Sequence, residues 1–154
     1  MITHKKVRFE DLFPIIQEKI SSGDSFTFCA FGVSMLPFIR NGKDLVTLGP
    51  IHDALSKNDI IFYRRENGQF VLHRIVKVCA DGSYNLCGDN QFRIEKGIRK
   101  SQIIAKLDRL ERNGKEISCD SLFSKIWCFF LPIRRFILHV KRSVMNRVKK
   151  RFQK

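Results

Sequence analysis

Residues 32–44 read Gly-Val-Ser-Met-Leu-Pro-Phe-Ile-Arg-Asn-Gly-Lys-Asp and separate two predicted strands. The segment before them, residues 25–31, is rich in Phe and is typical of a largely buried strand. After them, Asn41-Gly42 is a turn signal. Ser34 therefore follows a strand directly, in a segment built for burial, where an unpaired hydroxyl costs about 1–3 kcal/mol. We expect this hydroxyl to face a partner side chain.

Downstream of this segment, five β-rich runs follow one another. They are separated by stretches rich in Gly, Pro, Asn and Asp, including a predicted loop over residues 88–97, and Asn113-Gly114 closes one more hairpin. The runs span residues 44–48, 59–64, 69–79, 83–86 and 102–110. Tight turns without crossover helices predict antiparallel pairing. We therefore predict a mainly β protein with an antiparallel, coiled β-sheet domain over residues 25–118.

Both ends of the chain are predicted to be helical. Within residues 1–24, apolar side chains recur at helical spacing up to Ile20 and predict a short amphipathic helix. Within residues 119–154, apolar residues recur every three or four positions with Lys and Arg between them. This pattern predicts a basic amphipathic pair of helices, kinked or broken at Pro132.

The positive charge is concentrated at the C-terminal end. The chain has a formal net charge of +14, and ten Lys or Arg residues but no Asp or Glu lie within residues 121–154. Such a segment binds an anionic membrane surface or nucleic acid, or packs on the core as a helix. The cations alternate with an apolar stripe rather than with stacking residues, so nucleic acid ranks last. We predict that residues 121–154 bind an anionic membrane surface.

Composition limits the class of protein. A chain of 154 residues with 44% hydrophobic residues and 14 Phe is long enough for one folded domain with appendages. Five cysteines at irregular spacing, without a Cys-x-x-Cys pair, indicate reduced thiols, and we expect no metal site and no cofactor. No signal peptide and no stretch of about 18–20 apolar residues is recognised. The expected location is peripheral on the cytoplasmic face of a membrane, with the soluble cytoplasm as the alternative.

A serine nucleophile needs a base, and His73 is the best candidate among the four histidines. It lies in the middle of the apolar strand Phe-Val-Leu-His-Arg-Ile-Val, where an imidazole needs a hydrogen-bond partner. Gly32 allows the backbone near Ser34 to approach a ligand closely and leaves N–H groups free for an oxyanion. A lone histidine in a strand is more often structural than catalytic. The motifs in the rest of the chain are therefore needed to choose between these two roles for His73.

Five blocks in sequence order supply that pattern. They are Gly-Val-Ser-Met-Leu-Pro at 32–37, Asn-Gly-Lys-Asp-Leu-Val at 41–46, Lys-Asn-Asp-Ile-Ile-Phe-Tyr at 57–63, Val-Leu-His-Arg-Ile at 71–75 and Cys-Gly-Asp-Asn at 87–90. Over about residues 26–110, this order resembles the serine peptidases that include type I signal peptidases and LexA-type self-cleaving repressors.

The resemblance implies roles for individual residues. Ser34 matches the nucleophile and His73 the base, which places the chain in the Ser-His branch. Asp89 and Glu95 are both candidates for the acid that orients the base, and Lys43 and Lys77 are alternative bases. Backbone groups close to the nucleophile are the candidates for oxyanion and substrate binding, at Gly32, Val33, Met35 and Pro37.

The resemblance thus implies a serine endopeptidase that cleaves a protein or peptide substrate carrying a leader or signal-type segment. The alternative is a non-catalytic peptide-binding or membrane-associated module on the same fold. A self-cleaving regulator is less favoured, because only Ser22-Gly23 resembles a small-residue cleavage site before Ser34. Signal peptidases usually carry a membrane anchor before the nucleophile, whereas the candidate attachment here follows the β domain.

Overall fold

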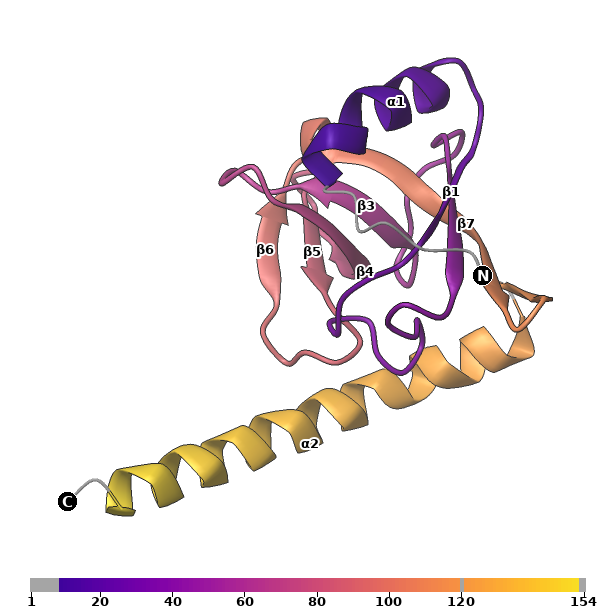
Figure 1. Ribbon diagram of the computed structural model, residues 1–154. Helices are drawn as coiled ribbons and strands as arrows, with labels where there is room; N and C mark the ends of the chain where they lie inside the picture. The colour runs from indigo at the N-terminus through magenta and orange to yellow at the C-terminus, as the bar shows by residue number, and fades with distance from the viewer. Residues whose placement is uncertain (1–8, 120, 153–154) are drawn as a thin grey trace.

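The computed structural model describes residues 9–119 and 121–152, so residues 1–8 of the predicted N-terminal helix region lie outside the description. Helix α1 (Phe9–Ser21) comes first and helix α2 (Leu122–Phe152) last, with a curled sheet between them (Figure 1). The strands are β1 (Phe26–Cys29), β2 (Leu45–Gly49), β3 (Ile60–Arg64), β4 (Phe70–Val78), β5 (Tyr84–Cys87), β6 (Glu95–Ile98), β7 (Ile103–Arg112) and β8 (Lys115–Ser118).

The sheet confirms the predicted mainly β, antiparallel fold. Its strands follow the order β1-β2-β7-β3-β4-β5-β6, β8 pairs with β7, and every pairing is antiparallel. One strand was not predicted, because Glu95–Ile98 forms β6 against β5 within and just beyond the expected loop over 88–97. This strand has four residues, two of them charged, and therefore shows too little apolar alternation to be recognised.

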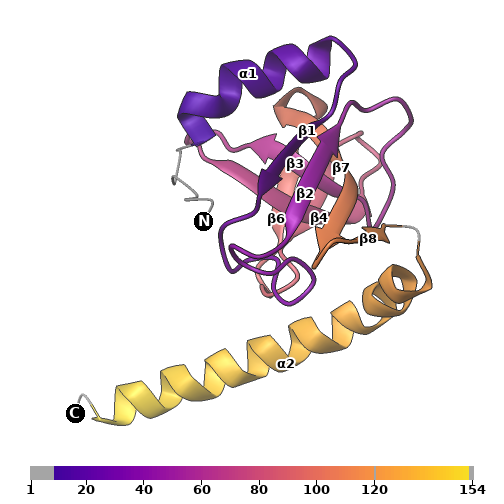
Figure 2. The same ribbon diagram turned by 45° about the vertical axis from the view of Figure 1, so that its right-hand side comes forward.

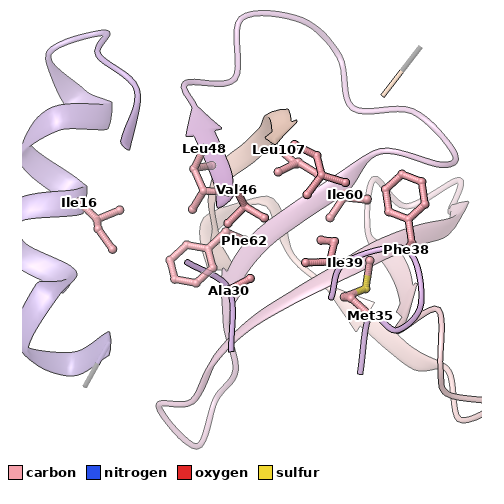
Figure 3. Close-up of a cluster of buried hydrophobic side chains, with 12 residues drawn as sticks. Ile16, Ala30, Met35, Phe38, Ile39, Val46, Leu48, Ile60, Phe62 and Leu107 are labelled. Carbon is pink, nitrogen blue, oxygen red and sulfur yellow. The ribbon is translucent and has the colours of Figure 1, made fainter. Parts of the chain in front are cut away.

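The sequence of strand β3 is apolar over residues 60–63 because the protein covers both faces of this strand. Ile60 and Phe62 belong to one buried cluster, whereas Ile61 and Tyr63 belong to a second cluster on the opposite face. Figure 3 shows the first cluster, in which Ile16 of α1 points toward residues of the sheet. The first cluster also receives residues of the turn that carries Ser34.

Helix α2 differs from the predicted pair of helices. It is one continuous helix with Pro132 inside it, and it runs along one side of the β domain and extends beyond it (Figures 1 and 2). Proline removes one backbone hydrogen bond, and the exposed Pro132 is accommodated without interrupting the helix. Within the residues that the structure describes, no helix has both the length and the apolar content needed to cross a bilayer.

Candidate active site

Ser34 lies on a turn that the core holds in place. The turn follows β1, and its side chains Met35, Phe38 and Ile39 are buried at 2–4% exposure, while Ser34 itself is half-buried. Gly32 enters the turn with φ of +127°, a conformation that other residues rarely adopt. The serine is thus presented between a glycine and three buried anchors.

The backbone around Ser34 offers donors for an oxyanion, but not at every predicted position. The N–H of Gly32 donates to Oδ1 of Asn41 at 2.8 Å and is therefore occupied. Pro37 has no N–H and follows a cis peptide bond. The N–H groups of Val33, Ser34 and Met35 donate no hydrogen bond to any described residue. These three N–H groups remain available near the hydroxyl.

His73 is oriented by two groups on its Nδ1 side. It lies on β4 with 1% exposure, and its Nδ1 is 3.3 Å from Oη of Tyr63 and 3.3 Å from Oε1 of Glu95. The Tyr63 hydroxyl donates to Oε2 of Glu95 at 2.8 Å, so its oxygen is free to accept from Nδ1. Both groups near Nδ1 are thus acceptors, which places the proton of the neutral imidazole on Nδ1 and leaves Nε2 as a base.

Nε2 of His73 faces the loop after β5 and the turn of Ser34. A Cβ atom added at Gly88 would lie 3.1 Å from Nε2 and 2.5 Å from the carbonyl oxygen of Ser34. Gly88 therefore fills a gap that no larger residue fits. Ser34 and His73 line one cavity of about 230 Å³. No hydrogen bond joins the Ser34 hydroxyl to His73 within the described part of the chain.

Burial sets the protonation state of this pair. Desolvation lowers the pKa of His73 to about 4, although the charge of Glu95 acts in the opposite direction. Burial alone would raise the pKa of Glu95, but hydrogen bonds from Arg65 and Tyr63 outweigh it and hold that pKa below its ordinary value. At neutral pH the arrangement is a neutral imidazole beside a carboxylate, as general-base chemistry requires.

Asp89 has a different role from Glu95. Its carboxylate is fully buried and accepts from Nε and Nη2 of Arg74 at 2.9 and 2.7 Å, and from Nε1 of Trp127 at 2.9 Å. These bonds hold the loop after β5 to β4 and to α2. Of the two predicted acids, Glu95 is therefore the one within contact distance of His73 Nδ1.

Several residues at the site were missed from the sequence. Tyr63 lies in β3, which pairs with β4, and the signal that could have identified it is an aromatic hydroxyl directly after the apolar residues 60–62. Arg65 holds Glu95 through Nε at 2.8 Å and through Nη2. The alternative bases Lys43 and Lys77 are exposed and do not line the cavity shared by Ser34 and His73.

Comparison with protein-family models and with curated proteins finds no match to this chain. All five cysteines are free thiols. Among residues 9–119 and 121–152, no group of three or more His, Cys, Asp or Glu side chains could hold a metal ion.

Proposed function

We propose that this protein is a serine endopeptidase with Ser34 as nucleophile, His73 as general base and Glu95 as the acid that orients His73. The observation that carries the proposal is the placement of the two imidazole nitrogens. Nδ1 faces Glu95 and Tyr63, whereas Nε2 faces Gly88, which lies against the carbonyl oxygen of Ser34. Ser34 and His73 also line the same cavity. An oriented base beside a serine is the arrangement of Ser-His-acid hydrolases.

In the proposed mechanism, Nε2 of His73 takes the proton of the Ser34 hydroxyl as Oγ attacks the peptide carbonyl. The negative charge that develops on the carbonyl oxygen is stabilised by the free N–H groups near Ser34. His73 then gives its proton to the leaving amine, which releases the first product. Water, deprotonated by the same nitrogen, attacks the acyl-serine and frees the second product with Ser34 restored.

The proposed substrate is an extended peptide with an apolar stretch, as in a leader or signal-type segment. Strand β1 lies at one end of the sheet order, pairs with β2, and is followed after two intervening residues by Gly32. A peptide that binds in an extended conformation alongside this part of the chain would run toward Ser34. The cavity beside Ser34 is lined by Phe28, Phe62 and Phe70, which suits an apolar side chain.

We also propose that an anionic membrane surface is a partner of α2. The side of α2 opposite its buried contacts exposes a row of large apolar side chains, at Leu122, Ile126, Phe129, Ile133, Phe136, Ile137, Val140 and Val144. This row belongs to a segment with ten cations and no acidic residue, so it complements a lipid surface of negative charge. Helix α2 can therefore pack on the β domain through one side and contact a membrane through the other side at the same time.

The competing function is a non-catalytic module that binds a peptide in the same cavity. The missing hydrogen bond between the Ser34 hydroxyl and His73 favours this alternative, although such bonds often tighten only when substrate binds. Both functions predict peptide binding along β1, and only the peptidase predicts a reactive serine.

The two functions are separated by treating the full chain with a serine-directed phosphonate probe, with and without anionic vesicles. The peptidase predicts one covalent adduct, located on Ser34 by mass analysis and absent from Ser34→Ala. Ser56→Ala, at an exposed turn, is the matched control and should react like the unmodified protein. If Ser34 is unlabelled at every pH, the peptidase proposal fails and the binding module becomes the favoured function.

A further inference from the structure

Helix α2 contacts the loop beside the nucleophile through its inner side. Ser124 and Leu131 are buried at 1% and 2% exposure, and Trp127 stacks on Phe38 of the Ser34 turn with ring centroids 6.3 Å apart. The loop after β5, residues 88–90, lies between this helix and the turn, as the contacts on its two sides show. The C-terminal helix is thus in direct contact with the candidate site.

Arg134 makes two hydrogen bonds from α2 to this loop. Its Nη2 donates to Oδ1 of Asn90 at 2.7 Å, and its Nε donates to the carbonyl oxygen of Asp89 at 3.2 Å. Trp127 adds a third bond from the helix by donating to the Asp89 carboxylate at 2.9 Å. Arg134 and Trp127 thus bind adjacent residues of one loop.

Asn90 connects Arg134 to the turn that carries Ser34. Its backbone N–H donates to the carbonyl oxygen of Ser34 at 2.8 Å, and its Nδ2 donates to the carbonyl oxygen of Val33 at 3.1 Å. One end of the side-chain amide therefore faces α2 and the other end faces the Ser34 turn. Since the oxygen of this amide is held by Arg134, its nitrogen is directed toward Val33.

We propose that Arg134 is a positioning residue for Ser34 and acts through Asn90. The proposal rests on the function proposed above, in which Ser34 is the nucleophile. Without the guanidinium, the Asn90 amide loses the donor that fixes its orientation, and the carbonyl groups of Val33 and Ser34 lose part of their support. A displacement of about 1 Å at a nucleophile can lower a rate about 100-fold. Helix α2 is therefore part of the catalytic machinery as well as a surface segment.

The test compares Arg134→Gln with Arg147→Gln in the full chain. Both variants remove one cation from α2, but Arg147 is exposed and has no hydrogen bond or ion pair among the described residues. We expect Arg134→Gln to lower the maximal rate of phosphonate labelling at Ser34 roughly 10- to 100-fold, with little change in the probe concentration for half-maximal rate. Arg134→Lys, which keeps one donor, should restore part of the rate.

A second readout does not depend on activity. Hydrogen–deuterium exchange, followed by mass spectrometry of peptides covering residues 33–42 and 88–92, should be faster in Arg134→Gln than in Arg147→Gln. If the unmodified protein is not labelled, the peptidase proposal fails, and the exchange data alone decide whether Arg134 orders the turn. If Arg134→Gln unfolds, Arg134→Lys takes its place in both measurements. Equal labelling and equal exchange in the Arg134 and Arg147 variants would overturn the proposal.

Discussion

Replacing Gly88 with Ala is the sharpest perturbation of the proposed nucleophile and base. The added methyl group would lie 2.5 Å from the Ser34 carbonyl oxygen, 3.1 Å from Nε2 of His73 and 3.2 Å from Cδ of Gln91. The first of these neighbours is backbone, so it cannot move aside by a change of rotamer. Gly88 has no positive φ, so the variant tests contact and not backbone strain.

The size of the effect follows from these distances. Ordinary contact begins at 3.4 Å, so the carbonyl oxygen of Ser34 must move by roughly 0.9 Å, which is 3.4 minus 2.5. Overpacking by one methyl group costs about 1–3 kcal/mol of stability. A shift of about 1 Å at the nucleophile lowers its reaction rate about 100-fold. We therefore expect a folded but destabilised protein that reacts very slowly.

The rate of phosphonate labelling at Ser34 is measured without denaturant. The free energy of unfolding is measured separately, by urea unfolding. Gly49→Ala is the matched control, because its added methyl group lies no closer than 3.4 Å to any neighbour. We expect Gly49→Ala to react and unfold much like the unmodified protein. Wild-type labelling and stability in Gly88→Ala would refute the placement of Gly88 between Ser34 and His73.

Two further predictions concern His73 and α2. The pKa of His73 is lowered to about 4 in the folded protein, so as pH falls from about 6.5 to 4 the unfolded chain binds the proton first and stability falls, by at most about 3 kcal/mol. Urea unfolding at pH 7 and pH 5 should show this loss in the unmodified protein and not in His73→Asn, and an equal loss in both would contradict it. For α2, the full chain should sediment with anionic vesicles at low salt, and replacing Phe129 and Phe136, which are 74% and 69% exposed, with Ser should weaken that binding roughly tenfold or more. Val78→Ser, an exposed apolar position on β4, is the control, and equal binding by all three proteins would exclude the apolar side of α2 as the contact.

Most of the sheet was predictable because its signals are local. The apolar run over residues 69–79 predicted β4, and the Asn113-Gly114 turn predicted the β7–β8 hairpin. Strand β6 was not predictable, because four residues at the end of the sheet need no apolar alternation. The sequence predicted a pair of helices kinked or broken at Pro132, and the break was wrong because α2 continues through Pro132. Buried contacts on both sides of the proline, at Ser124 and Leu131 and at the half-buried Arg134, help to offset the loss of one hydrogen bond.

The sequence identified candidate residues of the site, but it did not show how their side chains are arranged. Ser34 and His73 were chosen from sequence, and the structure places both on one cavity. The choice between Asp89 and Glu95 depends on pairing across strands, because β6 pairs Glu95 with Leu86 while β3 brings Tyr63 next to His73. Neither relation is visible along the chain. The contact from Arg134 to Asn90 joins residues 44 positions apart and has no local signal at all.

The pH dependence of phosphonate labelling at Ser34 tests the central claim most directly. If His73 is the base, the labelling rate should be half-maximal near pH 4 and level through neutral pH, because burial lowers the pKa of His73 to about 4. His73→Asn should reduce the rate at neutral pH by at least about 100-fold. A rate that rises only above pH 8, and that His73→Asn leaves unchanged, would contradict the account and assign the base to another group.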